Sequence, residues 1–126
     1  MNPAYAQACF EVEGELPTSF VIITAYNPRG LSAPQSRNQH QDITLHSILT
    51  QRGYRAVRVI GRDHENSHRE PGWGAEIDLQ TAKEIGKLFK QDAIFQVQNG
   101  LLHLHACNGK YHQELGKWSE RVLSST

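Results

Sequence analysis

The sequence has few cysteines, no net charge and no long apolar run. Its two cysteines, Cys9 and Cys107, are far apart and form no C-x-x-C motif, so we expect reduced thiols. No apolar segment approaches the roughly 20 residues of a transmembrane helix, and the N-terminus has no signal-peptide pattern. These features argue against a disulfide framework and a membrane-spanning helix. They lead us to expect a cytoplasmic protein.

The charge of the chain is balanced, with 13 Lys and Arg residues against 13 Asp and Glu residues. A protein that holds nucleic acid through its phosphates needs an excess of basic residues, so the balance argues against a nucleic-acid partner. At 126 residues the chain is predicted to form one domain, 1–126. Within it we expect an N-terminal arm over 1–18, a core over 19–107 and a C-terminal segment over 108–126.

The most strand-like segment covers residues 20–26, where β-branched and aromatic side chains follow one another. Apolar residues occupy both faces, so this strand is predicted to lie in the centre of a covered sheet. Pro28 and Gly30 then end the strand in a turn. A rigid strand therefore delivers the polar side chains of Thr24, Tyr26 and Asn27 to its end.

Two helices are predicted from apolar spacing. The first begins near Ser36 or Asn38, either of which is a suitable cap, and its stripe is formed by Ile43, Leu45, Ile48 and Leu49. The second follows Asp78, the expected cap, and its stripe is formed by Ala82, Ile85 and Phe89. The C-terminal segment repeats this spacing at Tyr111, Leu115, Trp118 and Val122. It is therefore predicted to be a helix that docks on the sheet or on a second copy of the chain, which leaves a homodimer open.

The remaining strands are predicted over 54–60, 73–77, 93–98 and 101–107. Asn99-Gly100 is a strong hairpin signal between the last two. In the second strand of the chain, Val57 and Val59 are expected to face the helices, which leaves Arg58 on the opposite face. The order predicts an α+β protein with a ferredoxin-like βαββαβ antiparallel sheet, an added C-terminal hairpin strand and two helices on one face.

In this arrangement the central strand runs antiparallel to neighbours that start near Trp73 and Ala93. The end of the central strand therefore lies beside the starts of both neighbours. Polar side chains from several segments meet at this rim, which is where ligands tend to be held. The predicted ligand-binding residues are Thr24, Tyr26, Asn27, Arg29, Asn38, Glu70, Trp73 and Gln91.

The same positions carry a family resemblance. The chain contains T-A-Y-N-P at 24–28, Asn38, G-Y at 53–54, E-P-G-W at 70–73 and F-K-Q-D-A-I-F at 89–95. In this combination it resembles a bacterial family of short single-domain proteins catalogued as domain of unknown function 3293. The resemblance extends over roughly residues 18 to 107, and glycine is frequent in that family where this chain has Lys90. Because the family has no established activity, the resemblance supports these positions and supplies no chemistry.

Metal binding is an alternative that the histidines suggest. His103 and His105 alternate on one strand face, and His64, His68 and His112 could approach them. The simpler interpretation is a polar strand surface, so we predict no resident metal and no cofactor. A thiolate–imidazole pair of Cys107 with His105 is a weaker alternative, because a thiol at a strand end is more often buried and inert.

A metal-assisted hydrolase or nuclease would use paired carboxylates. Glu70 and Asp92 are predicted at the rim, and Asp63 and Glu65 lie in the nearby loop. Helix capping, turn stabilisation and ordinary salt bridges explain these residues equally well. We therefore assign no catalytic residue.

An RNA-binding module is the alternative from a different class of function. The order of strands and helices matches the RNA-recognition motif, and an open sheet face would present Tyr26, Arg58 and His103. The third strand, however, lacks the aromatic residues that stack on bases. We therefore expect a binding module for a small polar or anionic ligand, or for a protein partner, with Arg29 supplying positive charge at the rim.

Overall fold

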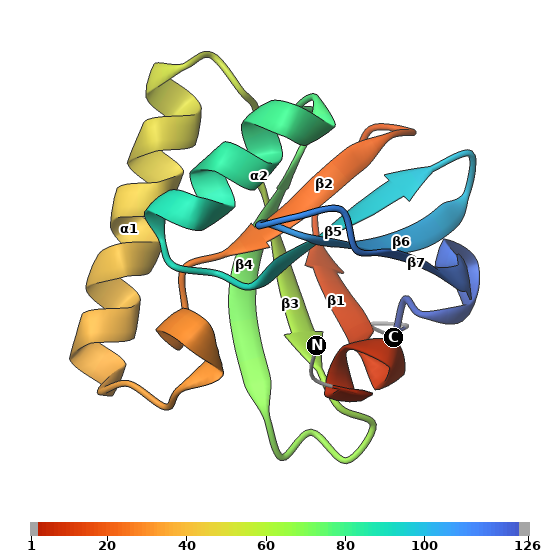
Figure 1. Cartoon of the computed structure of the whole chain (residues 1–126), viewed down its shortest axis with the longest axis horizontal. Coiled ribbons are helices and arrows are strands. Elements are labelled where there is room, and N and C mark those ends of the chain that lie inside the picture. Colours follow the sequence, from red (N-terminus) through yellow and green to blue (C-terminus); the bar gives the residue numbers. More distant parts are fainter. Residues whose placement is uncertain (1–2, 124–126) are drawn as a thin grey trace.

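The structure is a computed structural model that describes residues 3–123. Within this range, seven antiparallel strands form one sheet in the order β1-β3-β4-β2-β5-β6-β7 (Figure 1). No helix among these residues is long and apolar enough to cross a membrane. The helices are α1 (Gln35–Gln51) and α2 (Leu79–Leu88), with short 3-10 turns at Pro3–Gln7, Pro28–Gly30 and Trp118–Glu120. The strands are β1 (Cys9–Glu13), β2 (Phe20–Thr24), β3 (Val57–Arg62), β4 (Arg69–Ala75), β5 (Ala93–Gln98), β6 (Leu101–Ala106) and β7 (His112–Lys117).

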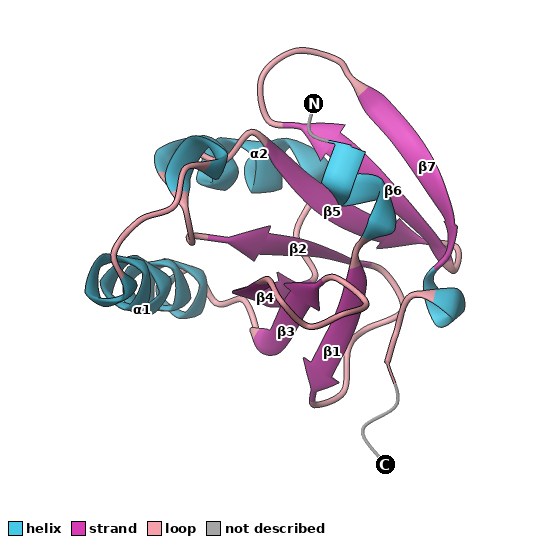
Figure 2. Ribbon diagram, turned by 90° about the horizontal axis from the view of Figure 1, so that it is seen from below, coloured by secondary structure: helices cyan, strands magenta, loops and turns pink. Residues whose placement is uncertain are grey.

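The ferredoxin-like prediction is wrong. The seven strands curl into a half-barrel whose outer face carries both helices (Figure 2), so the fold is not a βαββαβ sheet with one added hairpin strand. The two extra strands lie at the edges of the sheet. β1 forms within the N-terminal arm, and β7 forms where the C-terminal helix was predicted.

The C-terminal helix prediction fails because its apolar stripe is not buried on one side. Tyr111 and Val122 are exposed, and Leu115 is the buried residue of β7. Gly116 has a φ of 94°, which no right-handed helix accommodates. Residues 112–117 instead pair with β6 through backbone hydrogen bonds, which do not require an apolar face.

The pairing of the central strand is confirmed. β2 is antiparallel to β4, with Ile23 opposite Trp73, and antiparallel to β5, with Ile22 opposite Phe95. Asn99 and Gly100 both have positive φ in the predicted hairpin between β5 and β6. The core of the predicted strand order is therefore correct although the fold class is not.

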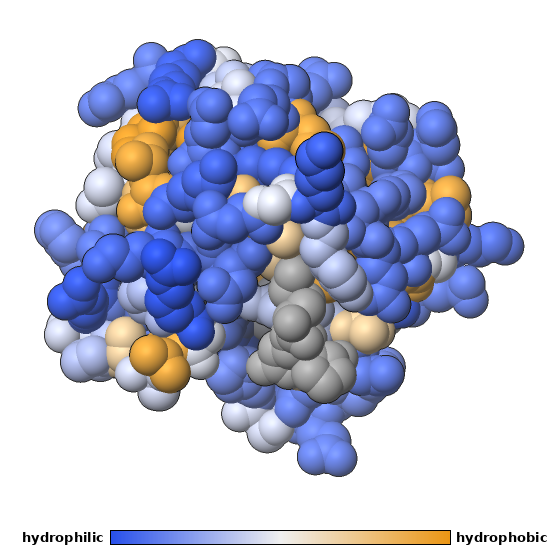
Figure 3. Space-filling view, in the orientation of Figure 1, coloured by the Kyte–Doolittle hydropathy of each residue, from blue (hydrophilic) through white to orange (hydrophobic). Residues whose placement is uncertain are grey.

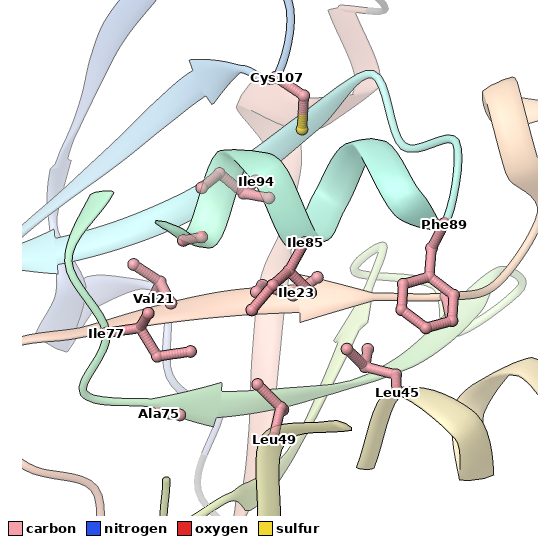
Figure 4. Packing of buried hydrophobic residues seen from close by; sticks show 12 residues of the cluster. Val21, Ile23, Leu45, Leu49, Ala75, Ile77, Ile85, Phe89, Ile94 and Cys107 are labelled. Atoms are coloured by element: carbon pink, nitrogen blue, oxygen red, sulfur yellow. The ribbon is translucent and has the colours of Figure 1, made fainter. Parts of the chain in front are cut away.

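Each face of β2 contributes to a separate hydrophobic core. Val21 and Ile23 point to the outer face, where they pack with Leu45 and Leu49 of α1 and with Ile85 of α2 (Figure 4). On the concave face, Phe20 and Ile22 belong to a second cluster, together with Phe10, Val59, Ala93, Val97, Leu102, Leu104 and Leu115. The apolar residues on both faces of the strand thus correspond to two covered faces.

Helix α2 forms as predicted, and α1 does so only in part. The Asp78 carboxylate caps α2 by accepting a hydrogen bond from the Thr81 N–H at 3.0 Å. In α1, Pro34 precedes the first turn, so the predicted cap at Ser36 or Asn38 is wrong. Ile43 of the predicted stripe is 65% exposed, whereas the buried residues of α1 are Asn38, Asp42, Leu45 and Leu49.

The predicted orientation of β3 is also wrong. Val59 packs in the concave cluster, so Arg58 points to the outer face under α1. There its guanidinium binds both carboxylate oxygens of Asp42, at 2.9 and 2.7 Å, and lies 3.8 Å from the ring centre of Trp73. The buried acid on α1 explains the reversal, because Arg58 neutralises a charge that would otherwise be desolvated.

The end of the chain closes the open side of the half-barrel. The Trp118 ring packs against Phe10 and Phe20, with ring centres 5.1 and 5.2 Å apart. Val122 forms a parallel bridge with Phe10 of β1, and the Arg121 guanidinium donates hydrogen bonds to the carbonyls of Ala6, Ala8 and Leu115. We call residues 118–123 the C-terminal clasp.

Candidate functional site

A cavity of about 340 Å³ opens on the concave side of the half-barrel. We call it the concave pocket. Its inner wall is apolar and is built by Phe10 of β1, Ile22 of β2, and Ala93 and Phe95 of β5. The remaining lining residues are Ala4, Tyr5, Ala8, Thr24, Gly30, Gly61, Arg62, Asp63, His68, Glu70, Gly72 and Gln91.

Aromatic rings form one side of the concave pocket. Phe10 and Phe95 meet edge to face with ring centres 5.1 Å apart, and Tyr5 meets Phe95 in the same way at 6.1 Å. Tyr5 comes from the N-terminal 3-10 turn, which β1 and the C-terminal clasp hold in place. These contacts make the aromatic wall rigid, because each ring is fixed by a neighbour from another segment.

The hollow itself depends on Gly61 near the end of β3. A Cβ atom at this position would lie 3.6 Å from Cε1 of Phe10, an ordinary van der Waals contact, so a side chain there would grow into the space beside Phe10. Glycine inside a strand often marks such an open approach. Gly61 therefore leaves room that any larger residue would fill.

Polar groups surround the mouth of the concave pocket. The Thr24 hydroxyl donates to the carbonyl of Pro71 at 2.8 Å and accepts from the N–H of Tyr26 at 3.1 Å. The Gln91 side-chain amide donates to the carbonyls of Tyr26 and Phe89 at 3.1 and 3.2 Å. Because both contacts use the nitrogen, the side-chain oxygen of Gln91 is the group left for other partners.

Glu70 is held at the mouth by two neighbours. Its Oε2 atom accepts from Asn27 Nδ2 at 3.4 Å and lies 3.2 Å from Nε2 of His68. Among the described residues, no hydrogen bond reaches its second oxygen, Oε1. The carboxylate is thus oriented by Asn27 and still has accepting capacity.

Asn27 and Asn38 form a tie behind Glu70. The backbone of Asn27 is left-handed, with φ 48°, and its N–H donates to the Asn38 side-chain oxygen at 2.9 Å. The Asn27 side-chain oxygen in turn accepts from Asn38 Nδ2 at 2.9 Å and from the N–H of Ala33 at 3.1 Å. This reciprocal pair fixes the turn after β2 against α1, and so it sets the position from which Asn27 contacts Glu70.

The other predicted residues lie away from the concave pocket. Arg29 is exposed, with its guanidinium 3.9 Å from the Asp92 carboxylate. Trp73 is on the outer face, where its ring contacts His46 with the ring centres 4.3 Å apart. Burial, followed by the charge of Asp42, raises the pKa of Tyr26, which does not line the concave pocket. The structure thus brings Thr24, Glu70 and Gln91 to the mouth, with Asn27 and Asn38 behind them.

Several pocket-lining residues were not among the predicted ligand-binding residues, namely Tyr5, Phe10, Gly61, His68 and Phe95. One signal was available. Gly61 interrupts a strand segment with a residue that leaves space beside Phe10, and Gly72 in the next strand also lines the pocket. The aromatic residues gave no such signal, because their patterns are those of ordinary core positions.

The other charges around the mouth are occupied. The Arg62 Nε atom lies 2.7 Å from Oε2 of Glu11, a carboxylate that also accepts hydrogen bonds from Arg69 at 2.8 and 3.0 Å. Asp63 accepts hydrogen bonds from Ser67 and from the N–H of His68, and these bonds lower the pKa of Asp63. Burial, followed by the charges of Glu70 and Asp92, raises the pKa of Tyr5, so the phenol stays protonated.

The comparison with known families identifies one family. The family described as "Protein of unknown function (DUF3293)" matches residues 23–94, more than half of the chain. The chain belongs to this family. The matched region of DUF3293 runs from β2 to the start of β5 and contains the mouth residues, whereas Tyr5, Phe10 and Phe95 lie outside it. Comparison with curated proteins and with solved structures gave no match.

Lys90, where the resemblance implies glycine, follows the C-cap residue of α2 and has a left-handed backbone, with φ 57°. The carbonyl of Lys90 accepts a hydrogen bond from the N–H of Arg29 at 2.8 Å. A glycine would adopt this conformation without strain.

The histidines do not assemble as a metal centre. His103 Nδ1 lies 2.9 Å from His112 Nε2, and the His105 ring stacks on His112 with centres 4.5 Å apart. Over residues 3–123, no group of at least three His, Cys, Asp or Glu side chains is arranged to hold a metal ion. His64 lies elsewhere, with its Nδ1 atom 3.5 Å from the Cys9 sulfur.

The geometry also disfavours the thiolate and RNA alternatives. Burial, followed by the charge of Asp92, raises the pKa of Cys107 to about 11, so its sulfur is a neutral thiol near pH 7. Arg58 is bound to Asp42 under α1 and is not displayed beside His103 on an open sheet face. Neither chemistry has the groups that it requires.

A second hollow, of about 380 Å³, lies at the other end of β2. It is lined by Glu15, Leu16, Pro17, Gly53, Tyr54, Arg55 and Glu76. The Arg55 guanidinium already donates to the carbonyl of Glu15 at 2.9 Å. None of the predicted site residues lines this hollow, so the concave pocket is the better candidate.

Proposed function

We propose that the protein is a binding module for a small polar ligand, which it holds in the concave pocket. One observation carries the proposal: a cavity with a rigid aromatic wall meets free hydrogen-bond acceptors, Glu70 and Gln91, at a single mouth. Small-molecule sites commonly combine an apolar hollow with a few well-placed polar groups. The cavity of about 340 Å³ has the size of such a site.

A protein partner is less well supported than a small ligand. The face shown in Figure 3 is mainly hydrophilic, and its hydrophobic patches are separate from one another. The exposed large apolar residues, including Leu31, Ile43 and Leu88, come from different elements. Single exposed apolar residues are normal on a protein surface and do not mark an interface.

Hydrolysis by paired carboxylates is also less well supported. Asp92 faces Arg29, and Asp63 accepts a hydrogen bond from the N–H of Ser67 within its own turn. Glu70 is then the carboxylate with free capacity at the mouth, and a single acid does not divide the roles of general acid and base. A binding role needs no second carboxylate.

A fragment screen followed by amide chemical shifts tests the proposal. Fragments that bind should shift the amides of pocket residues such as Phe10, Gly61, Glu70 and Phe95. Gly61→Ala should weaken binding, and Gly61→Val should weaken it further, because each added methyl group occupies part of the hollow. Preserved amide shifts outside the pocket would show that each of the two Gly61 variants remains folded, so a loss of binding could not be attributed to unfolding.

The result that contradicts the proposal is equally specific. Fragments whose shifts cluster outside the concave pocket, or whose affinities are the same in wild type and Gly61→Val, would show that the hollow is not the binding site. A screen without any hit at about 10 mM, a very weak affinity, would lead to the same conclusion.

A further inference from the structure

We propose that the ligand of the concave pocket is a small organic cation, an ammonium or guanidinium group on a compact apolar body. The inference rests on the proposed function, because it names the ligand class for the same pocket. It is based on the side-chain atoms at the mouth that have no hydrogen-bond partner among the described residues.

At the mouth, the side-chain atoms without a hydrogen-bond partner among the described residues are acceptors. Glu70 has one carboxylate oxygen without a hydrogen bond among the described residues. The side-chain nitrogen of Gln91 donates to two backbone carbonyls, which leaves its side-chain oxygen as an acceptor. Thr24 already donates to Pro71 and accepts from Tyr26. A ligand therefore meets a negative oxygen and an amide oxygen, and both require a donor.

The positive charges near the mouth each lie beside a carboxylate. Arg62 Nε is 2.7 Å from Glu11, which Arg69 also binds, and Arg29 faces Asp92 outside the pocket. His68 lines the pocket, and its ring nitrogen lies 3.2 Å from Glu70. A ligand anion would thus be repelled by the Glu70 charge at the mouth, whereas a ligand cation would be attracted to it.

The aromatic wall suits a cation as well. Tyr5, Phe10 and Phe95 line the apolar half of the cavity, and aromatic ring faces attract cations that have lost part of their water. Burial raises the pKa of the Tyr5 phenol, and the charges of Glu70 and Asp92 raise it further, so these carboxylates act on a residue of the wall. The carboxylate fixes the charged end of the ligand, and the rings receive its apolar body.

Three probes that share a phenyl ring separate the possible classes: benzylammonium, benzyl alcohol and benzoate. Amide shifts of the whole chain report both the affinity and the location of each probe. We expect benzylammonium to bind in the concave pocket at least about tenfold more tightly than benzyl alcohol, the effect of a hydrogen bond to a charged group. Benzoate should bind more weakly than either.

Glu70→Gln tests the charged partner while keeping the shape of the side chain. It should weaken benzylammonium binding about tenfold and leave benzyl alcohol nearly unchanged. Glu84→Gln is the matched control, because this exposed carboxylate on α2 lines neither hollow and should leave every affinity unchanged. Should Glu70→Gln fail to fold, salt provides a second measurement on the wild-type chain. Raising NaCl from about 50 mM to about 500 mM should weaken benzylammonium binding alone.

Tighter or equal binding of benzyl alcohol or benzoate overturns the cation class and leaves the proposed function standing, because the pocket is still occupied. Equal loss in Glu70→Gln and Glu84→Gln, or salt-independent binding of benzylammonium, overturns the role of Glu70. If none of the three probes binds at about 10 mM, the cation class is overturned. The fragment screen then decides separately whether the pocket binds any small molecule.

Discussion

Asn38 and Asp42 show how buried polar residues are satisfied within this chain. Asn38 exchanges two hydrogen bonds with Asn27, and Asp42 binds both terminal nitrogens of Arg58. A buried polar group without a partner costs free energy, so such pairs leave little capacity for a ligand. Glu70 and Gln91 differ because each keeps a side-chain oxygen to which no group of residues 3–123 donates a hydrogen bond. The candidate site is therefore identified by side-chain oxygens that have no hydrogen-bond partner among the described residues.

His105 should make the protein less stable in mild acid. Burial, then the charges of His112, Lys83 and His103, lowers the pKa of His105 from 6.5 to about 4. The unfolded chain therefore binds this proton more readily than the folded chain, and stability falls as the pH drops from about 6.5 to about 4. The shift corresponds to about 3 kcal/mol at most, and we expect a loss of roughly 1–2 kcal/mol because solvent reaches part of the ring.

Urea unfolding at several pH values across this window checks the histidine prediction. His105→Gln keeps a polar side chain next to Gln96, whose oxygen lies 2.8 Å from the histidine ring, and removes the titrating group. This variant should lose less stability on acidification than the wild type, whereas the exposed control His40→Gln should behave like the wild type. Parallel stability curves for wild type and His105→Gln would exclude His105 as the cause.

At the scale of elements, α2 was predictable from the sequence and α1 was not fully so. The buried side of α2 is apolar and begins at an Asp cap, which are both local features. The buried side of α1 includes Asn38 and Asp42, whose partners Asn27 and Arg58 lie on other elements. A periodic pattern does not reveal that two polar residues face inward, because that depends on partners distant in sequence.

The packing of α2 on the sheet depends on Gly86. A Cβ atom there would lie 2.7 Å from the Cys107 sulfur and 3.2 Å from Ile94 Cγ2. Alanine is a better helix former than glycine by about 1 kcal/mol, but overpacking a core costs about 1–3 kcal/mol. We therefore expect Gly86→Ala to lower the free energy of unfolding in the wild-type chain, as measured by urea denaturation.

Cys107→Ala provides the partner variant for the Gly86 prediction. It removes the sulfur that the new methyl group would strike, so Gly86→Ala should cost less in this background or even stabilise it. A double-mutant cycle measures the difference as a coupling energy, which we expect to be on the order of 1 kcal/mol. Additive effects of the two substitutions would show that α2 shifts away from the sheet instead of clashing with residue 107.

For the whole molecule, the sequence predicted the centre of the sheet and missed its edges. Strand β2 and its antiparallel neighbours were predicted because each strand has a clear alternating or apolar pattern. β7 has Leu115 as its one buried residue, and β1 pairs with β3 across a long separation in sequence. The concave pocket arises only when these edges curl and bring Tyr5 and Phe10 opposite Glu70. The sequence therefore predicted some of the residues at the mouth of the concave pocket, but it did not predict the aromatic wall of the pocket.

The C-terminal clasp should hold the wall of the concave pocket in place. Trp118 packs on Phe10, which is itself a pocket residue, and the backbone of Phe10 bonds to Arg121 and Leu123 at 2.8 Å. Trp118→Ala should cost roughly 2–4 kcal/mol through lost aromatic packing, and Arg121→Met should cost roughly 1–3 kcal/mol through its lost backbone contacts. Arg52→Met, an exposed arginine after α1, is the control and should cost little. Guanidinium unfolding gives these values, and hydrogen exchange of the Phe10 amide reports the clasp directly. Because the clasp supports β1, both variants should speed this exchange more than that of the Val21 amide in β2. Equal acceleration at the two amides would mean that the residues stabilise the fold as a whole and do not fix β1 specifically.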